Sequence, residues 1–427
     1  MIIDINTNIM YYNNINILEV DMRVIVVGGG AAGLIASGYS AMSGNDTILI
    51  EKNEKVGKKI YITGKGRCNV TNAVDPREFL SNVIRGDKFL MSALYSFTPE
   101  DMMNVIESYG TPLKVERGNR VFPVSDHSSD IIKALANFAH SCGVDIRLNT
   151  DVKDIIIRDN RVGGVILSDG SRIDADKVIV ATGGVSYRAT GSTGDGYTFA
   201  RHAGHSIVDI VPSLVGIDVN YEDIASLSGL TLRNVTLSAY RGERLLYSNL
   251  GEMLFTHTGV SGPLVLSTSA HINRENLKNI KLVIDMKPAL DMETLDTRII
   301  SDFKKYNNKI LLNALVDLMP HSMIEHVIKK AKVDPYKKVN SITKEERMRL
   351  VHTIKNFTLY PTKLGDINMA VVTSGGVNTK EINPKNMESK LVSGLHFAGE
   401  VMDVDALTGG FNLQIAFSTG YLAGNTL

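Results

Sequence analysis

The segment that most constrains the fold is an apolar run that ends in a glycine-rich turn. Residues 24–27 are all Val or Ile and lead into Gly28-Gly29-Gly30-Ala31-Ala32-Gly33, which has the spacing G-x-G-x-x-G. Small residues follow to about Ser43, and a second apolar run, Thr47–Ile50, ends at Glu51. This order of strand, turn, helix, strand and acid predicts a β-α-β unit that binds a dinucleotide.

Each small residue of the turn has a physical task. Gly28 permits the tight turn, Gly30 lets the backbone approach a pyrophosphate, and Gly33 lets the helix pack closely on the sheet. The first helical N–H groups then face the phosphates, and Glu51 can bind ribose hydroxyls. The alternative is an ordinary strand–turn–helix with glycines placed by chance. The predicted contacts of this unit are Gly28, Gly30, Ala31, Ala32, Gly33, Glu51 and Lys52.

The composition is typical of a globular enzyme. The chain has 427 residues, 44% hydrophobic and 22% charged, which suits two or three domains. A net charge of zero gives no global reason to expect nucleic acid or an anionic membrane as partner. Cys68 and Cys142 form no C-x-x-C pair, which excludes a disulfide framework and favours a reducing, cytoplasmic compartment.

Two long uncharged stretches and the first 21 residues could be mistaken for membrane or targeting segments. Residues 24–45 and 406–427 carry no charge and are long enough to span a bilayer, but their glycines and polar side chains favour buried α/β segments, so we expect no membrane contact. Residues 1–21 contain no Lys or Arg, unlike a secretory signal. We expect residues 1–21 to be a disordered extension, with Met22 as the start of ordered structure and an alternative to Met1 as the true start.

The remaining pattern predicts an α/β domain interrupted by an insertion. A run of short strands before Ala181-Thr182-Gly183-Gly184 is typical of a meander in FAD domains. The expected discontinuous FAD-binding domain covers residues 22–200 and 346–427, and the insertion covers residues 201–345, β-rich to about 290 and helical from 291. Other expected elements are helices at 99–109, 127–141 and 409–425, a hairpin at 115–124, and strands at 144–148, 152–158, 162–167, 172–173, 177–181, 232–240, 281–285, 369–373 and 396–399.

Separated motifs carry a resemblance to a known family. They are GGGAAGLIAS at 28–37, GKGRCNVTN at 64–72, RVFPVS at 120–125, ATGGVSY at 181–187, TGSTGDGY at 190–197, LFTHTGVSGP at 254–263, TSGGV at 373–377 and HFAGEVMDVDALTGGFNLQIAFSTG at 396–420. With them the chain resembles the bacterial aminoacetone-oxidase-like FAD-binding flavoproteins over nearly everything after Met22. Two departures are Arg188, where members often have proline, and Ala406, where many have glycine.

The resemblance implies a fold and a reaction. The fold is α/β, a glutathione-reductase-type FAD-binding Rossmann domain with an inserted β-rich plus helical domain. The family includes a reductase of bile-acid 7α-dehydroxylation, which acts on 3-oxo-Δ4,6 steroids, and members linked to reduction of a uridine in ribosomal RNA. The implied activity is transfer of hydride from NAD(P)H through FAD to a C=C bond conjugated to a carbonyl.

The resemblance also implies further cofactor contacts. Arg67 could neutralise a phosphate, whereas the alternative is a surface arginine on a structural loop. A buried packing role is the simpler interpretation of Cys68. The helix that starts at Gly410 would direct its positive end at the flavin. The implied contacts are Lys59, Gly64, Gly66, Arg67, Cys68, Asn69, Val152, Thr182, Gly183, Gly399, Glu400, Gly410, Asn412 and Leu413.

Two side chains are candidates for catalysis. Tyr187 follows the Ala181–Gly184 turn and could donate a proton to the substrate, and Arg188 could hold a substrate carboxylate. A buried structural tyrosine is the alternative. No metal-ligand pattern is found among the ten histidines. The chain has no second G-x-G-x-x-G, so NAD(P)H would dock transiently near the flavin.

The insertion leaves the substrate open. Residues 298–355 contain thirteen Lys or Arg and six Asp or Glu, which suits a solvated surface or an RNA contact. Their interleaved apolar residues suit a helical lid over a small apolar, carbonyl-bearing substrate. The first expectation is a bile-acid enone; reduction of an RNA uridine, amine oxidation and flavin binding without turnover are alternatives. The oligomeric state cannot be read from the sequence. The apolar residues of the expected lid, which are interleaved with the charged residues of 298–355, are Leu311, Leu312, Leu315, Met319, Ile324, Val327 and Ile328.

Overall fold

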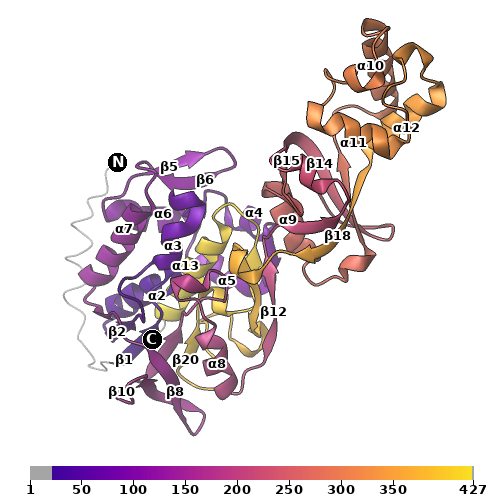
Figure 1. Ribbon diagram of the computed structural model, residues 1–427. Helices are drawn as coiled ribbons and strands as arrows, with labels where there is room; N and C mark the ends of the chain where they lie inside the picture. Colours follow the sequence, from indigo (N-terminus) through magenta and orange to yellow (C-terminus); the bar gives the residue numbers. More distant parts are fainter. Residues whose placement is uncertain (1–21, 426–427) are drawn as a thin grey trace.

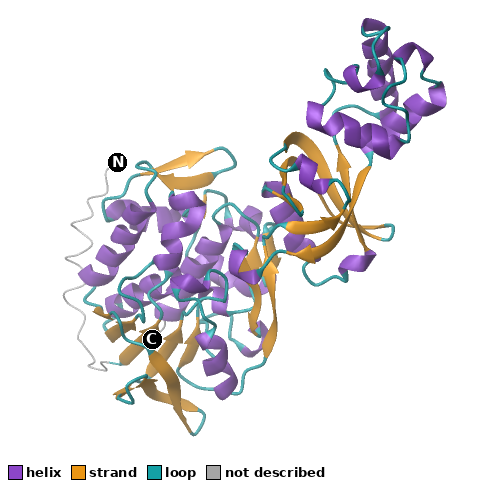
Figure 2. Cartoon of the chain, viewed as in Figure 1, coloured by secondary structure: helices purple, strands orange, loops and turns teal. Residues whose placement is uncertain are grey.

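The computed structural model describes residues 22–425, so the expectations for residues 1–21 lie outside the described part. Figure 1 shows a body that contains both ends of the described chain, and an arm that projects from it. The arm consists of residues 217–364, and its outer end, the tip, consists of residues 291–355. Figure 2 shows that strands form the inner part of the arm and helices its tip.

A five-stranded parallel sheet forms the centre of the body. Its strand order is β20-β11-β1-β2-β7. The inner strands are almost wholly Val, Ile and Leu, because helices cover both faces of such a sheet. The strands are β1 (Arg23–Val27), β2 (Asp46–Ile50), β7 (Asp145–Arg147), β11 (Lys177–Val180) and β20 (Leu395–Phe397).

Strand β7 corrects one expectation. Residues 144–148 were grouped with the meander, yet Asp145–Arg147 pairs in parallel with Ile48–Ile50 of β2. A short edge strand alternates in exposure like a meander strand, so its pattern does not reveal its partner. The meander itself contains β8 (Val152–Arg158), β9 (Arg161–Leu167) and β10 (Arg172–Asp174) in antiparallel order.

The C-terminal helix packs against the first helix of the chain. These are α13 (Phe411–Gly424) and α2 (Ala31–Met42). A Cβ on Gly420 would lie 2.4 Å from the carbonyl oxygen of Ala32, and a Cβ on Gly424 would lie 2.3 Å from that of Ala36. Glycine therefore allows the two backbones to approach, and it joins the two ends of the chain in one core.

The arm begins with a closed barrel. Its strand order is β13-β16-β15-β14-β17-β18. The insertion extends past residue 345, where its end was expected. Strand β18 follows that residue and still belongs to the arm, because it pairs with β13 and β17 and closes the barrel. The strands are β13 (Ile217–Asn220), β14 (Thr231–Arg241), β15 (Arg244–Phe255), β16 (Gly259–Ser261), β17 (Ile280–Asp285) and β18 (Phe357–Leu364).

Helices cover the barrel and form the tip. The tip contains α10 (Met292–Lys305), α11 (His321–Ala331) and α12 (Lys344–Lys355), while α9 (Pro263–Ile272) lies beside the barrel. Strands β12 (Ile207–Ser213) and β19 (Val372–Val377) pair with each other where the chain enters and leaves the arm. The arm has a hydrophobic core separate from that of the body.

The other elements lie in the body. Thr98 caps α6 by accepting the N–H of Asp101, whose side chain accepts the N–H of Thr98 in return. None of the helices within residues 22–425 is both long and apolar enough to cross a membrane. The remaining elements are α3 (Lys58–Ile62), α4 (Pro76–Leu80), α5 (Asp87–Ser96), α6 (Pro99–Ser108), α7 (Ser128–Ser141), α8 (Asp195–His202), β3 (Thr71–Asn72), β4 (Val83–Arg85), β5 (Leu113–Glu116), β6 (Arg120–Pro123) and β21 (Asp405–Ala406).

Candidate functional site

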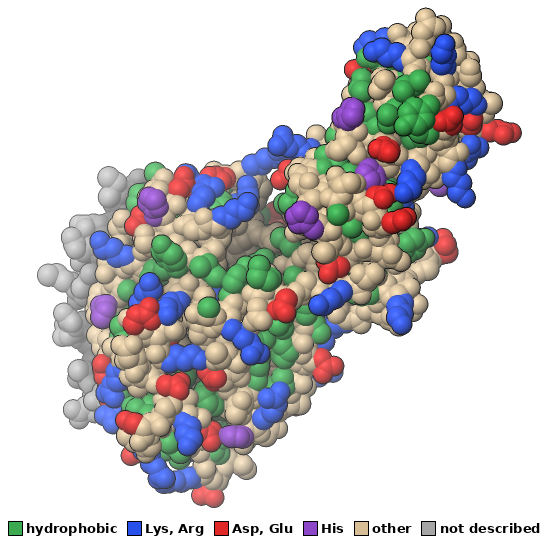
Figure 3. Space-filling model, in the orientation of Figure 1, with side chains coloured by type: hydrophobic (Ala, Val, Ile, Leu, Met, Phe, Trp, Pro, Cys, Tyr) green, Lys and Arg blue, Asp and Glu red, His purple; other side chains and the backbone are tan. Residues whose placement is uncertain are grey.

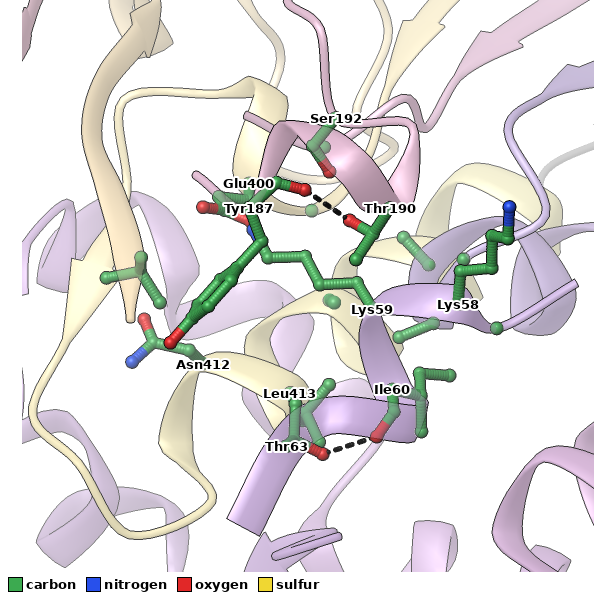
Figure 4. A pocket seen from close by; sticks show the side chains of 18 of the residues that line it. Lys58, Lys59, Ile60, Thr63, Tyr187, Thr190, Ser192, Glu400, Asn412 and Leu413 are labelled. Carbon is green, nitrogen blue, oxygen red and sulfur yellow. Dashed lines mark hydrogen bonds and ion pairs between the residues drawn. The ribbon is translucent and has the colours of Figure 1, made fainter. Parts of the chain in front are cut away.

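A large cavity opens at the carboxyl ends of the parallel strands. Its volume is about 970 Å³, and it is lined by Val27, Ile50, Ala181 and Ala398, which end or directly follow four of the five strands. Ligands of open α/β sheets bind at this edge. Figure 3 shows a hollow on the surface where the body meets the arm, and Figure 4 shows the cavity lining from close by.

The glycine-rich turn leaves room for a ligand at one position. Gly28 has a φ of +108°, and a Cβ there would lie 2.6 Å from the carbonyl oxygen of Ala181. A Cβ on Gly33 would lie 1.8 Å from the carbonyl oxygen of Gly28, so Gly33 serves the packing of α2. A Cβ on Gly30 would meet nothing within 4 Å. The space above Gly30, at the uncapped start of α2, fits a pyrophosphate.

Glu51 holds the turn in place. Its Oε2 accepts the N–H of Gly29 at 2.8 Å, and its Oε1 accepts the backbone and side-chain N–H groups of Asn53 at 2.8 and 2.6 Å. The residue is buried yet lines the cavity. Its contact with a ribose stays a prediction. The neighbouring Lys52 Nζ lies 2.6 Å from Asp195 Oδ2, so the Lys52 ammonium is already paired with a carboxylate.

A partly buried ion pair joins the N-terminal and C-terminal parts of the lining. Lys59 Nζ donates to Glu400 Oε2 at 2.7 Å, and Glu400 Oε1 accepts the N–H of Thr373 at 2.7 Å. Ser186 also donates to Glu400, at 3.2 Å. Burial opposes ionisation of Glu400, but the Lys59 ammonium and the Thr373 hydrogen bond outweigh it and hold the pKa of Glu400 below its ordinary value.

The start of α13 is the second helix N-terminus on the cavity. Gly410 has a φ of +97°, and a Cβ there would lie 2.3 Å from the carbonyl oxygen of Thr71. Asn412 Oδ1 accepts the N–H of Ala406 at 2.9 Å, and its Nδ2 donates to the carbonyl of Ala406 at 2.8 Å. Gly410, Asn412 and Leu413 all line the cavity, which thus receives the positive ends of both α2 and α13.

The loop at residues 64–69 differs in part from expectation. The Arg67 guanidinium pairs with Glu116 and with Asp126, the latter at 2.6 Å, and lies 4.2 Å from the ring centroid of Phe122. It lines the cavity, but two carboxylates of the hairpin region already neutralise it. Cys68 lies outside the lining, and burial raises the pKa of its thiol to about 12, which makes it an unreactive packing residue.

The two catalytic candidates are separated by the structure. Tyr187 lines the cavity, and Figure 4 shows its ring extending toward Asn412. Its backbone has a φ of 51°, and its N–H donates to the carbonyl of Asn368 at 3.3 Å. Arg188 does not line the cavity, so the expectation that it holds a substrate there is not supported.

Most predicted contacts share this one cavity. Gly33, Gly66 and Cys68 do not line it: Gly33 packs α2 on the turn, and Cys68 is buried in the core. Four further lining residues were not predicted, although the last two lie in quoted motifs: Asn53, Thr63, Phe122 and Asp195. The predicted residues that line it are Gly28, Gly30, Ala31, Ala32, Glu51, Lys52, Lys59, Gly64, Arg67, Asn69, Val152, Thr182, Gly183, Tyr187, Gly399, Glu400, Gly410, Asn412 and Leu413.

The tip of the arm is no lid. From the arm, only Pro263 and Leu266 of α9 line the cavity. The apolar residues of the tip, such as Leu315 and Val327, are buried in the core of the arm itself. The expected helical lid is therefore wrong, because the apolar faces of the tip helices pack against one another and the barrel. Within residues 22–425, no cluster of three or more His, Cys, Asp and Glu could hold a metal ion.

Comparison with known proteins gives a family match and several relatives. The family model described as the HI0933-like protein Rossmann domain matches residues 22–426. A 3-dehydro-bile acid Δ(4,6)-reductase of Clostridium scindens is 30% identical over 94% of this chain and 98% of its own length. A ribosomal RNA dihydrouridine synthase of Haemophilus influenzae is 32% identical over 93% of this chain and 96% of its own length.

Solved structures agree with the fold. A 3-ketosteroid-Δ4-(5α)-dehydrogenase of Rhodococcus jostii RHA1 has a TM-score of 0.50 and 16% identity, covering 96% of this chain and 98% of its own. A 3-ketosteroid Δ1-dehydrogenase of Sterolibacterium denitrificans has a TM-score of 0.51 and 14% identity, covering 94% and 98%. The predicted Rossmann-type FAD-binding fold with a β-rich and helical insertion is confirmed.

Proposed function

Since the chain belongs to the HI0933-like family and has the fold of FAD-dependent oxidoreductases, we propose that it reduces a C=C bond conjugated to a carbonyl. The observation that carries this proposal is the convergence of two helix N-termini, α2 and α13, on one cavity beside an open glycine position. One N-terminus suits the pyrophosphate, and the other suits an electron-rich ring system.

The residues present fit FAD. The turn at Gly28–Gly30 and the first residues of α2 would hold the pyrophosphate, Glu51 would bind the adenosine ribose, and Val152 would contact the adenine through its backbone. When bound, FAD supplies the two-electron chemistry of the reaction. Gly410 and Leu413 at the start of α13 would lie along the flavin ring, and the partial positive charge there favours its reduced, anionic form.

The chain itself would orient the substrate and supply a proton. The Tyr187 hydroxyl faces the same part of the cavity as the Asn412 amide, and Asn412 is held by two hydrogen bonds to Ala406. We assign the Tyr187 hydroxyl to proton donation at the α-carbon or carbonyl oxygen of the substrate. NAD(P)H would be the electron donor and would dock transiently, because the sequence has no second dinucleotide fingerprint.

Two substrates fit this reaction. A 3-oxo-Δ4,6 bile-acid intermediate has the required conjugated C=C bond, and one of the relatives is named for it. The uracil C5=C6 bond is also conjugated to a carbonyl, and other relatives are named for its reduction in ribosomal RNA. The shape of the arm favours RNA. Its tip leaves the cavity uncovered and carries exposed lysines, whereas a small apolar substrate would gain from cover. The exposed lysines of the tip that form no ion pair with a described residue are Lys304, Lys309, Lys332, Lys338 and Lys344.

The test is anaerobic reduction of the purified flavoprotein followed by mixing with each acceptor. Reoxidation of the bound flavin by a 3-oxo-Δ4,6 steroid supports the bile-acid substrate, and reoxidation by unmodified ribosomal RNA supports uridine reduction. Oxygen consumption with an amine and no response to either acceptor would show an amine oxidase. A flavin that neither NADH nor NADPH reduces would show a binding protein without turnover.

A further inference from the structure

A second cavity of about 330 Å³ adjoins the first. The two share Arg120, Leu407, Thr408 and Gly409 in their linings. The second cavity lies where the body meets the barrel, since its wall includes the β5–β6 turn and α4 of the body, and β15 and α9 of the arm. A molecule bound in the large cavity near Thr408 can therefore extend another of its groups into the second cavity.

Amide side chains from separate segments form much of this wall. They are Asn72, Asn82, Asn119 and Asn249. The amide of Asn72 is fixed, because its Nδ2 donates to the carbonyls of Gly118 and Gly409, each at 3.0 Å. Its Oδ1 is buried and accepts no hydrogen bond from any described residue, which costs free energy unless a donor is supplied.

Other polar groups at the cavity are uncommitted. The side chains of Asn119, Ser267 and Thr408 make no hydrogen bond to another residue in the described range, and all three line the cavity. Asn249 Nδ2 donates to the Tyr247 hydroxyl at 3.1 Å, and the Tyr247 ring is stacked on His271 with centroids 4.2 Å apart. The wall thus offers donors, acceptors and a flat aromatic side chain.

The charge at the rim is suited to a phosphate. Arg120 is exposed and forms no ion pair with a described residue; its Nε donates to the carbonyl of Arg117, also exposed, at 3.1 Å. One carboxylate, Glu78, lines the same cavity and can accept a hydrogen bond from an amino group of a base. Amides recognise the edges of bases, an arginine binds phosphate, and an aromatic ring stacks on a base.

We propose that the second cavity is a nucleotide subsite of the proposed reductase. The assignment of this subsite rests on the proposed function, because it requires that the substrate ring or the electron donor enters the adjoining large cavity. The nucleotide has two sources: the residue next to the reduced uridine in RNA, or one half of the nicotinamide dinucleotide. Both carry a base, a ribose and a phosphate, so the same amides and arginine bind either.

The experiment compares the flavoprotein with a double variant, Asn119→Gly and Asn249→Ala. Glycine suits position 119, where φ is +57°, and Asn249 lies on an exposed strand, so both changes keep the fold. The control is Asn220→Ala, exposed on β13 and outside both cavities. The probes are a fluorescein-labelled short RNA with one central uridine, uridine monophosphate as competitor, and NADP⁺ followed by calorimetry.

The double variant should bind the RNA about tenfold more weakly, because two hydrogen-bonding amides are lost, and uridine monophosphate should displace the RNA from the wild type. Weaker NADP⁺ binding with unchanged RNA binding would assign the subsite to the electron donor. Equal affinities of the double variant and the wild type for both probes, or no binding of either to the wild type, would overturn the proposal. Acceptor reduction by the wild type is measured in parallel, so failure of the reaction is distinguished from failure of the subsite.

Discussion

Lys59 and Glu400 form an ion pair of 2.7 Å although 341 residues separate them in the chain. The pair joins α3 to the segment after β20, and both residues line the large cavity. Segments from the first and last parts of the body therefore meet at the cavity, and a bound cofactor would contact both of them.

The first prediction concerns this pair. Lys59→Met should lower the free energy of unfolding by about 1.5–3 kcal/mol, the range for a hydrogen bond to a charged group, because it leaves the Glu400 carboxylate unpaired. Urea denaturation measures it. Glu400→Gln added to Lys59→Met should recover part of the loss, and no recovery would show that the pair is not coupled. Because the folded pKa of Glu400 lies below its ordinary 4.5, this contribution is present at neutral pH and lost as the pH falls through the folded pKa.

The second prediction concerns the pyrophosphate position. Gly30→Val should abolish FAD binding and leave the circular dichroism spectrum unchanged, because Gly30 has φ −85° and ψ −165°, which valine also adopts, while the new side chain enters open space in the cavity. Flavin content after purification is the measurement. Gly163→Val on β9, outside the cavity, should retain FAD. Full retention in the Gly30 variant would refute the placement of the pyrophosphate.

The third prediction concerns proton donation. Tyr187→Phe should leave FAD binding and reduction by NAD(P)H intact and slow substrate reduction by about 10²–10⁴-fold, the usual effect of losing a general acid. Stopped-flow measurement of the two half-reactions separates these effects. Arg188→Ala is the adjacent control and should change neither half-reaction strongly, because Arg188 does not line the cavity. An unchanged second half-reaction in Tyr187→Phe would assign the tyrosine a structural role.

The fourth prediction concerns Asp405, which is fully buried beside the strands that lead to the arm. Ser213 on β12 and Ser374 on β19 donate to it at 2.9 and 3.1 Å. Burial raises the pKa of Asp405 from 3.8 to about 6. Because the folded form binds this proton more tightly than the unfolded form, raising the pH from about 4 to about 6 destabilises the protein.

Asp405→Asn removes this pH dependence. The variant should be more stable than the wild type at neutral pH by at most about 3 kcal/mol, a shift of about two pKa units, and the difference should vanish near pH 4. Thermal unfolding across this pH range is the measurement. Asp209→Asn, exposed on β12, is the control. A difference for Asp405→Asn that does not change with pH would contradict the prediction.

Local sequence patterns predicted the central elements of the body. Strands β1 and β2 and helix α2 follow from hydrophobic runs, glycine spacing and a strand-end acid, all of which act over a few residues. The quoted motifs also predicted that segments near residues 28, 64, 182, 400 and 410 belong to one site. The segments near residues 28, 182 and 400 follow strands of the parallel sheet at its carboxyl edge, where the start of α13 near residue 410 and the loop near residue 64 also line the cavity.

Contacts between segments distant in the sequence decided the extent of the arm and the side-chain partners at the site. The end of the arm was misplaced because β18 belongs to the barrel only through its partners β13 and β17, which a local pattern does not specify. The partners of Arg67 and Glu400, the exclusion of Arg188 from the cavity and the burial of the tip's apolar residues likewise depend on side chains far apart in the chain. The sequence alone determined the β-α-β unit and its ligand-facing turn, whereas the tertiary structure decided which charges are already neutralised and what covers the site.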